Sequence, residues 1–84
     1  MTALPVPDLT IDAIGLRCPL PVLRARKRLE ALAPGQVLCL LADDPMAAID
    51  LPHFCHEAGH VFLSAEETPD GLRLLLRKGA PGPG

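Results

Sequence analysis

The chain has 84 residues, 49% of them hydrophobic, which is enough for one domain with an apolar core of its own. Its formal net charge of −2 gives no general attraction to nucleic acid or to an anionic membrane surface. It has two phenylalanines and no tryptophan or tyrosine, too few aromatic side chains for binding single-stranded nucleic acid by base stacking. We therefore expect neither a nucleic acid nor a membrane as a direct partner.

Cysteine usage indicates a reducing compartment. Cys18, Cys39 and Cys55 are odd in number and cannot make a closed disulfide framework. The N-terminal stretch MTALPVPDLT lacks the basic start and apolar region of a secretion signal. No apolar run approaches the ~20 residues that span a bilayer. These features predict a cytoplasmic protein.

In chain order, the sequence first predicts a strand and a helix. Residues 9–14 alternate, with Leu9, Ile11 and Ala13 on one side, which is typical of a half-buried strand. Residues 19–33 then carry apolar side chains at helical spacing, and a Pro-Gly pair follows them. The members of this apolar stripe are Val22, Ala25, Leu29 and Leu32.

The second half of the chain predicts three more strands and further helix. Residues 37–43 are continuously apolar, as expected for a central strand. Asp44 as N-cap and Pro45 at the first helical position indicate a helix start, and residues 51–60 carry a second short helix that Gly59 ends. Strands are predicted over 61–68 and 72–78, joined by a turn at 69–71, with Leu72, Leu74 and Leu76 facing inward.

The order β-α-β-α-β-β predicts an α+β fold. We expect a two-layer sandwich, in which two helices lie on one face of a mixed four-stranded sheet. Residues 1–84 are expected to form a single domain, with flexible segments at 1–8 and 80–84.

Cys18 is the strongest candidate for a functional residue. It stands where the first helix should begin, at its N-cap, with Pro19 and Pro21 fixing the first turn. A helix N-terminus carries a partial positive charge, which favours the thiolate, and Arg17 is the adjacent residue. The sequence therefore predicts a reactive thiol with a lowered pKa, presented outward.

Positive charge follows this cysteine along the helix. Five of the eight basic residues lie between positions 17 and 28, and no acid interrupts them. On a helical wheel Leu20 falls beside Arg24 and Lys27, away from the apolar stripe. We expect Leu20, Arg24, Lys27 and Arg28 to form a surface that docks an acidic partner protein, although charge runs are often only solvated helix faces.

Other chemistry-bearing residues have structural explanations. Cys39 lies mid-strand and is expected to be an inert core thiol. The segment HFCHEAGH contains three histidines and Cys55, but its spacing is not that of a structural zinc site, so we expect no metal. Cys55 could still serve as a secondary thiol. Asp43 and Asp44 are explained as helix capping, and nothing in the sequence places a histidine near Cys18.

The segment DAIGLRCPLPVLRARK resembles the signature of the TusA/SirA-like family of small sulfur-carrier proteins, in which a Cys-Pro-x-Pro motif opens the first helix. The similarity continues through PGQVLCLLADDP, DLPHFCHEAGH and LLLRKG, from about residue 10 to 79. Position 20 varies in the motif, so Leu20 does not violate it.

The resemblance implies a βαβαββ sandwich and a persulfide sulfur carried on Cys18. That sulfur would come from a cysteine desulfurase or a rhodanese-like donor and pass to an acceptor protein in tRNA thiolation, molybdenum cofactor synthesis or sulfur oxidation. Such a carrier needs no bound cofactor and has little catalysis of its own, and we expect it to be a monomer when free. The sequence names neither donor, acceptor nor pathway. The alternative is a redox or regulatory module that uses Cys18 in mixed disulfides.

Overall fold

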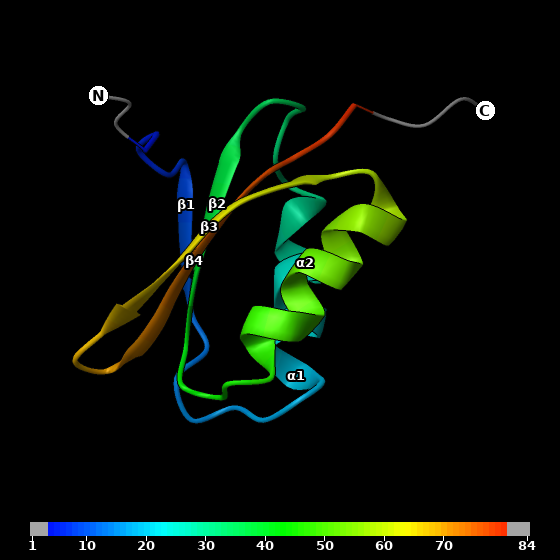
Figure 1. Ribbon diagram of the computed structural model, residues 1–84. Coiled ribbons are helices and arrows are strands. Elements are labelled where there is room, and N and C mark those ends of the chain that lie inside the picture. Colours follow the sequence, from blue (N-terminus) through cyan, green and yellow to red (C-terminus); the bar gives the residue numbers. More distant parts are fainter. Residues whose placement is uncertain (1–3, 81–84) are drawn as a thin grey trace.

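A computed structural model describes residues 4–80. Its elements occur in the predicted order and pack as two layers (Figure 1). They are β1 (Leu9–Asp12), α1 (Leu20–Leu29), β2 (Val37–Ala42), α2 (Ala47–Ala58), β3 (Val61–Thr68) and β4 (Gly71–Arg77). The expected flexibility of 1–8 and 80–84 falls partly outside the described residues, since 1–3 and 81–84 are not among them.

The four strands form one mixed sheet in the order β1-β2-β4-β3. β2 is central, because it pairs parallel to β1 and antiparallel to β4. β3 and β4 form a hairpin that is interrupted by an irregularity between Phe62 and Ser64. The predicted α+β fold with a mixed four-stranded sheet is therefore confirmed.

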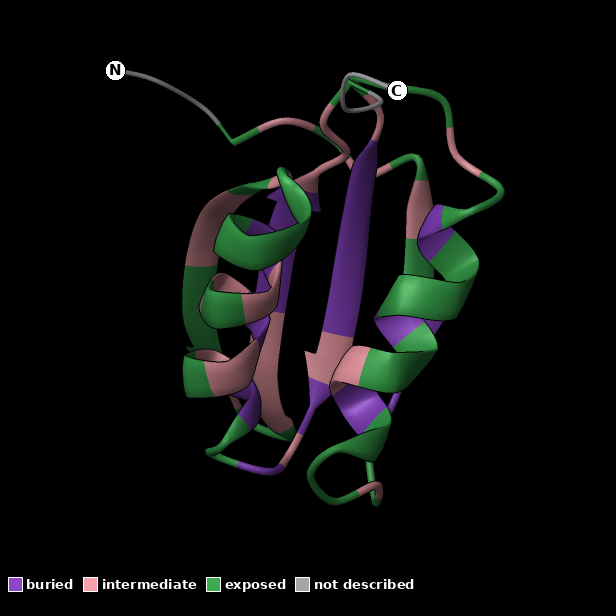
Figure 2. Cartoon of the chain, turned by 90° about the vertical axis from the view of Figure 1, so that its right-hand side faces the viewer, coloured by how far each residue is buried: buried purple, intermediate pink, exposed green. Residues whose placement is uncertain are grey.

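Both helices cover the same face of the sheet, and their exposed residues point away from it (Figure 2). The core fills the space between the layers. From the sheet it takes alternate residues of β2 and β4, which are fully buried: Leu38, Leu40, Leu74 and Leu76. From α1 it takes the predicted stripe, with Ala25 and Leu29 buried and Val22 and Leu32 partly buried.

The opposite face of the sheet buries a smaller cluster, in which Val37, Cys39 and Leu75 pack with Leu41 and Leu63. β2 thus buries side chains on both faces, which explains its continuously apolar sequence. Cys39 is 1% exposed, in agreement with its predicted place in the core.

Several predicted boundaries were wrong. β1 ends at Asp12, two residues early, because the Asp12 carboxylate accepts the Ile14 N–H and turns the chain. α1 ends at Leu29 instead of Ala33, because the next residues tighten into three-residue turns. Residues 47–58 form one helix and not two.

The continuous α2 includes Pro52 in its interior. A proline at this position removes one main-chain hydrogen bond of the helix. Ala47, Leu51 and Cys55 nevertheless repeat every four residues and are all buried. Burial of this unbroken stripe against the sheet outweighs the lost bond. The predicted stop is confirmed, since Gly59 ends the helix in the left-handed conformation.

Candidate functional site

The site lies at the edge of the sheet where β1 and β2 end. Because these strands are parallel, the loops that lead from them into α1 and α2 leave the same edge and run close together (Figure 1). Asp43, in the second loop, joins them: its Oδ1 accepts the Gly15 N–H and the Arg17 guanidinium, each at 2.9 Å. These two donors lower the pKa of Asp43.

Asp44 holds Cys18 in place. Its Oδ2 accepts the main-chain N–H of Cys18 at 2.8 Å, and its Oδ1 accepts the Met46 N–H at 3.1 Å. These bonds lower the pKa of Asp44, which is 8% exposed. The prediction of Asp44 as N-cap and Pro45 as first helical residue was wrong, since the N-cap is Met46. The carboxylate instead ties the start of α2 to the residue that precedes α1.

The prediction of Cys18 as N-cap was wrong, since Pro19 is the N-cap of α1 and Cys18 lies one residue before it. The carbonyl of Pro19 accepts the Leu23 N–H, and that of Arg17 accepts the Leu20 N–H. Pro21 lies in the first turn and is fully buried, so it anchors the start of the helix in the core. The Cys18 side chain is exposed.

The surroundings of the Cys18 sulfur are acidic. Its thiol donates a hydrogen bond to Oδ2 of Asp50, in the first turn of α2, at 2.9 Å. This bond, some desolvation and the charges of Asp50 and Asp44 raise the pKa of Cys18. The predicted lowering was therefore wrong. Arg17 provides no counter-charge here, because it is paired with Asp43.

A groove between the two helices runs from Cys18, and we call it the interhelix groove. Its volume is about 410 Å³. Apolar side chains dominate its lining, and the polar ones come from α2. It is lined by Cys18, Pro19, Val22, Leu23, Asp50, His53, Phe54 and Glu57.

The basic residues predicted to dock a partner are on the surface. Arg24, Lys27 and Arg28 are exposed, and Leu20 is 50% exposed. Helix α1 thus presents cations outward, whereas the groove side of α2 presents the carboxylates of Asp50 and Glu57.

The other two cysteines differ from Cys18 in accessibility. Cys39 and Cys55 are each 1% exposed, and neither forms a disulfide. Burial raises the pKa of Cys55 to about 11 and also raises that of Cys39. Cys55 is therefore poorly suited to the secondary thiol role that its sequence left open.

The histidines do not converge on one point. His53 lies on the surface of α2, 3.9 Å from Glu57. His60 follows the helix, packs against Phe54 and accepts the Gly79 N–H through Nδ1 at 3.0 Å. Among residues 4–80, no three His, Cys, Asp or Glu side chains are grouped so that they could hold a metal ion.

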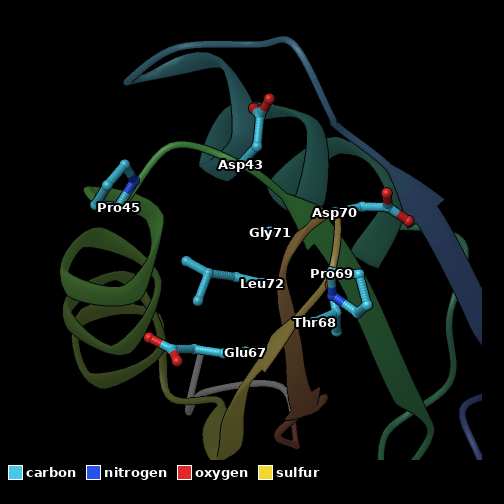
Figure 3. A pocket seen from close by; sticks show the side chains of 8 residues that line it. All are labelled: Asp43, Pro45, Glu67, Thr68, Pro69, Asp70, Gly71 and Leu72. Atoms are coloured by element: carbon cyan, nitrogen blue, oxygen red, sulfur yellow. The ribbon is translucent and has the colours of Figure 1, made fainter.

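A second hollow, of about 520 Å³, lies between the β2–α2 loop, which contains Asp43, and the β3–β4 turn (Figure 3). Asp43, Glu67 and Asp70 line it, together with Pro45, Thr68, Pro69, Gly71 and Leu72. No thiol or imidazole is among these lining residues. We therefore place the candidate site at Cys18 and the interhelix groove.

The fold and the site define a class: a small α+β domain that presents one accessible thiol at the start of its first helix. Residues 9–78 match the sulfurtransferase TusA family, and the chain belongs to that family, whose members act in sulfur relay between donor and acceptor proteins. The crystal structure of a SirA-like protein from Desulfitobacterium hafniense is similar, with a TM-score of 0.75 and 31% sequence identity. The match covers 86% of this chain and 99% of that one. The family resemblance seen in the sequence is confirmed.

Sequence reasoning missed that Asp50 accepts a hydrogen bond from the Cys18 thiol. It also missed that Asp43 and Asp44 bridge the two loops. Asp50 is 32 residues from Cys18 along the chain, so no local motif joins them. The available signal was topological, because loops that follow neighbouring parallel strands meet at one edge of a sheet.

Proposed function

We propose that this protein carries sulfur as a persulfide on Cys18. The observation that supports this most is that Cys18 is the exposed thiol, while Cys39 and Cys55 are buried. Asp44 and the buried Pro21 fix the main chain on either side of it. The sulfur is therefore held at a defined position from which a partner can reach it.

In the transfer step, the Cys18 sulfur attacks the outer sulfur of a donor persulfide. A sulfur–sulfur bond forms at Cys18 and the donor's sulfur–sulfur bond breaks. The donor's inner sulfur leaves as a thiolate and takes up one proton, which balances the proton lost by Cys18. No external oxidant or reductant is needed.

The donor in this proposal is a cysteine desulfurase or a rhodanese-like protein. The acceptor belongs to tRNA thiolation, molybdenum cofactor synthesis or sulfur oxidation. Arg24, Lys27 and Arg28, with the half-exposed Leu20, form the surface that docks acidic regions of these partners.

Other parts of the proposal concern the state of the free protein. We place it in the cytoplasm on the strength of its free cysteines. We also propose that the free protein is a monomer with a single domain. Within residues 4–80, no helix is long and apolar enough to cross a membrane.

The alternative redox-sensing role is less well supported. A sensor cysteine reacts through a stabilised thiolate, whereas the neighbours of Cys18 raise its pKa. A carrier whose thiol is activated only in contact with a partner agrees better with these neighbours.

Mass spectrometry tests the assignment directly. The purified protein is incubated with a cysteine desulfurase and L-cysteine, and we expect its mass to rise by one sulfur atom. Cys18→Ser should abolish this gain, while Cys39→Ala and Cys55→Ala, as matched controls that remain folded by circular dichroism, should retain it. Loading that persists in Cys18→Ser, or that requires Cys55, would overturn the proposal.

A further inference from the structure

The hydrogen bond between Cys18 and Asp50 exists only in the unloaded protein. The Cys18 thiol donates its proton to Oδ2 at 2.9 Å. Once Cys18 carries a second sulfur, its own Sγ no longer bears a hydrogen, and the bond is lost. Asp50 therefore acts on the step in which sulfur is accepted, because that step requires the free thiol to lose its proton.

Asp50 opposes that loss of the proton in the free protein. It accepts from the neutral thiol, and its charge repels the thiolate, so the resting sulfur is held in its less nucleophilic form. Something must offset the Asp50 charge before the sulfur can attack. The neighbouring Arg17 is not available, since its guanidinium pairs with Asp43 at 2.9 Å.

The interhelix groove shows what can reach Asp50. The apolar part of its lining comes from Pro19, Val22, Leu23 and Phe54. Its charged lining residues, Asp50 and Glu57, are both acidic, and no lysine or arginine lines it. The complementary occupant is a segment with apolar side chains and a cation.

The two helices beside the groove also leave large apolar side chains exposed. Leu23, which lines the groove, is 47% exposed. Leu20 in the first turn of α1 is 50% exposed, and Met46 and Ile49 at the start of α2 are 43% and 63% exposed. Exposed apolar side chains on the elements beside a reactive group favour protein contact.

We infer that the interhelix groove binds a segment of the sulfur donor that carries apolar side chains and one lysine or arginine, and that this cation pairs with Asp50 and frees the Cys18 thiol from its hydrogen bond. The inference rests on the proposed function. The freed thiol loses its proton to water, and its sulfur attacks the donor persulfide; the donor's leaving thiolate takes up a proton, so the step balances. Donor docking and activation of the cysteine are thereby one event.

The first test measures the alkylation of Cys18 by iodoacetamide as a function of pH, with peptide mapping to confirm the site. The charged or titratable groups that contact the thiol or line the groove are Asp50, His53 and Glu57 of α2 and Asp44 of the adjacent loop. Asp50→Asn keeps the side-chain shape and removes the charge. We expect alkylation near neutral pH to be at least about threefold faster, with the whole profile moved to lower pH.

The matched control is Asp70→Asn, which removes an exposed carboxylate from the β3–β4 turn, outside the groove. It should keep the wild-type profile. An Asp50→Asn profile identical to the wild type, or an equal change in Asp70→Asn, would show that Asp50 does not control the thiol.

The second test uses two short, capped peptides as probes, one alternating leucine with lysine and one alternating leucine with glutamate. We expect the leucine–lysine peptide to shift the amide resonances of Val22, Leu23 and Phe54 and to accelerate Cys18 alkylation in the wild type but not in Asp50→Asn. The inference fails if the leucine–glutamate peptide accelerates alkylation equally, or if neither peptide perturbs the groove. Sulfur loading of Cys18→Ser reports on the proposed function separately, so the two failures can be distinguished.

Discussion

Leu51→Ala probes how firmly α2 holds its side of the site. Leu51 is fully buried, whereas its companions on the buried stripe of α2, Ala47 and Cys55, are small. The substitution removes three carbon atoms, about 2.4 kcal/mol at ~0.8 kcal/mol each, and leaves a cavity that raises the cost to about 3 kcal/mol. A domain of this length has a free energy of unfolding of about 4 to 13 kcal/mol.

Urea denaturation followed by circular dichroism measures this loss. With a slope of about 1 kcal/mol per molar urea for a domain this small, the midpoint should fall by about 2 to 3 M. Ile49→Ala, on the same helix but 63% exposed, is the matched control and should change stability by less than about 0.5 kcal/mol. A loss below about 1 kcal/mol for Leu51→Ala, or equal losses for the two variants, would refute the account of how α2 is anchored.

Three further predictions concern other parts of the molecule. In the native protein, a thiol reagent should label Cys18 at least about a hundredfold faster than either buried cysteine, and equal labelling after unfolding is the internal control. Lys78 donates to the carbonyl of Leu29, the last residue of α1, and to that of Leu32 in the turns after it, so Lys78→Met should lower the free energy of unfolding by about 1 kcal/mol, measured in urea. Burial and the charge of Lys78 lower the pKa of His60. The unfolded chain therefore binds this proton more readily, and stability should fall as the pH decreases from about 6.5. His60→Asn should reduce that slope, and an unchanged slope would contradict the assignment.

The spacing of apolar residues predicted the layers of the fold, because each helix or strand buries side chains at its own regular interval along the sequence. The alternation of Leu72, Leu74 and Leu76 placed β4 with its inner face toward the helices, as observed. The second helical region shows the limit of this reasoning. Local patterns indicated a helix start at Asp44 and a second short helix over 51–60, whereas α2 is one helix. The continuous packing of Leu51 and Cys55 depends on tertiary contacts that a local rule does not include.

The chemistry of the site was less predictable than its location. Local rules made Cys18 the candidate, because the expected helix start and the two prolines are adjacent to it in sequence. They misjudged its ionisation, because they counted the neighbouring cations and could not count Asp44 and Asp50, which come from a distant segment. A carboxylate at hydrogen-bond distance shifts the pKa of the thiol more than a helix end does, or than a cation such as Arg17 that is already paired with Asp43.

The charges of the two helices have a consequence for docking. The outer face of α1 presents Arg24, Lys27 and Arg28, while α2 presents Asp50 and Glu57 to the groove beside it. A partner surface with a single sign of charge would be attracted to one helix and repelled by the other. A surface that pairs an acidic region with one cation matches both, and only in one orientation. In that orientation the cation lies at Asp50, next to the cysteine. Under the proposed function, the charge pattern that selects the donor would then also determine when the thiol becomes reactive.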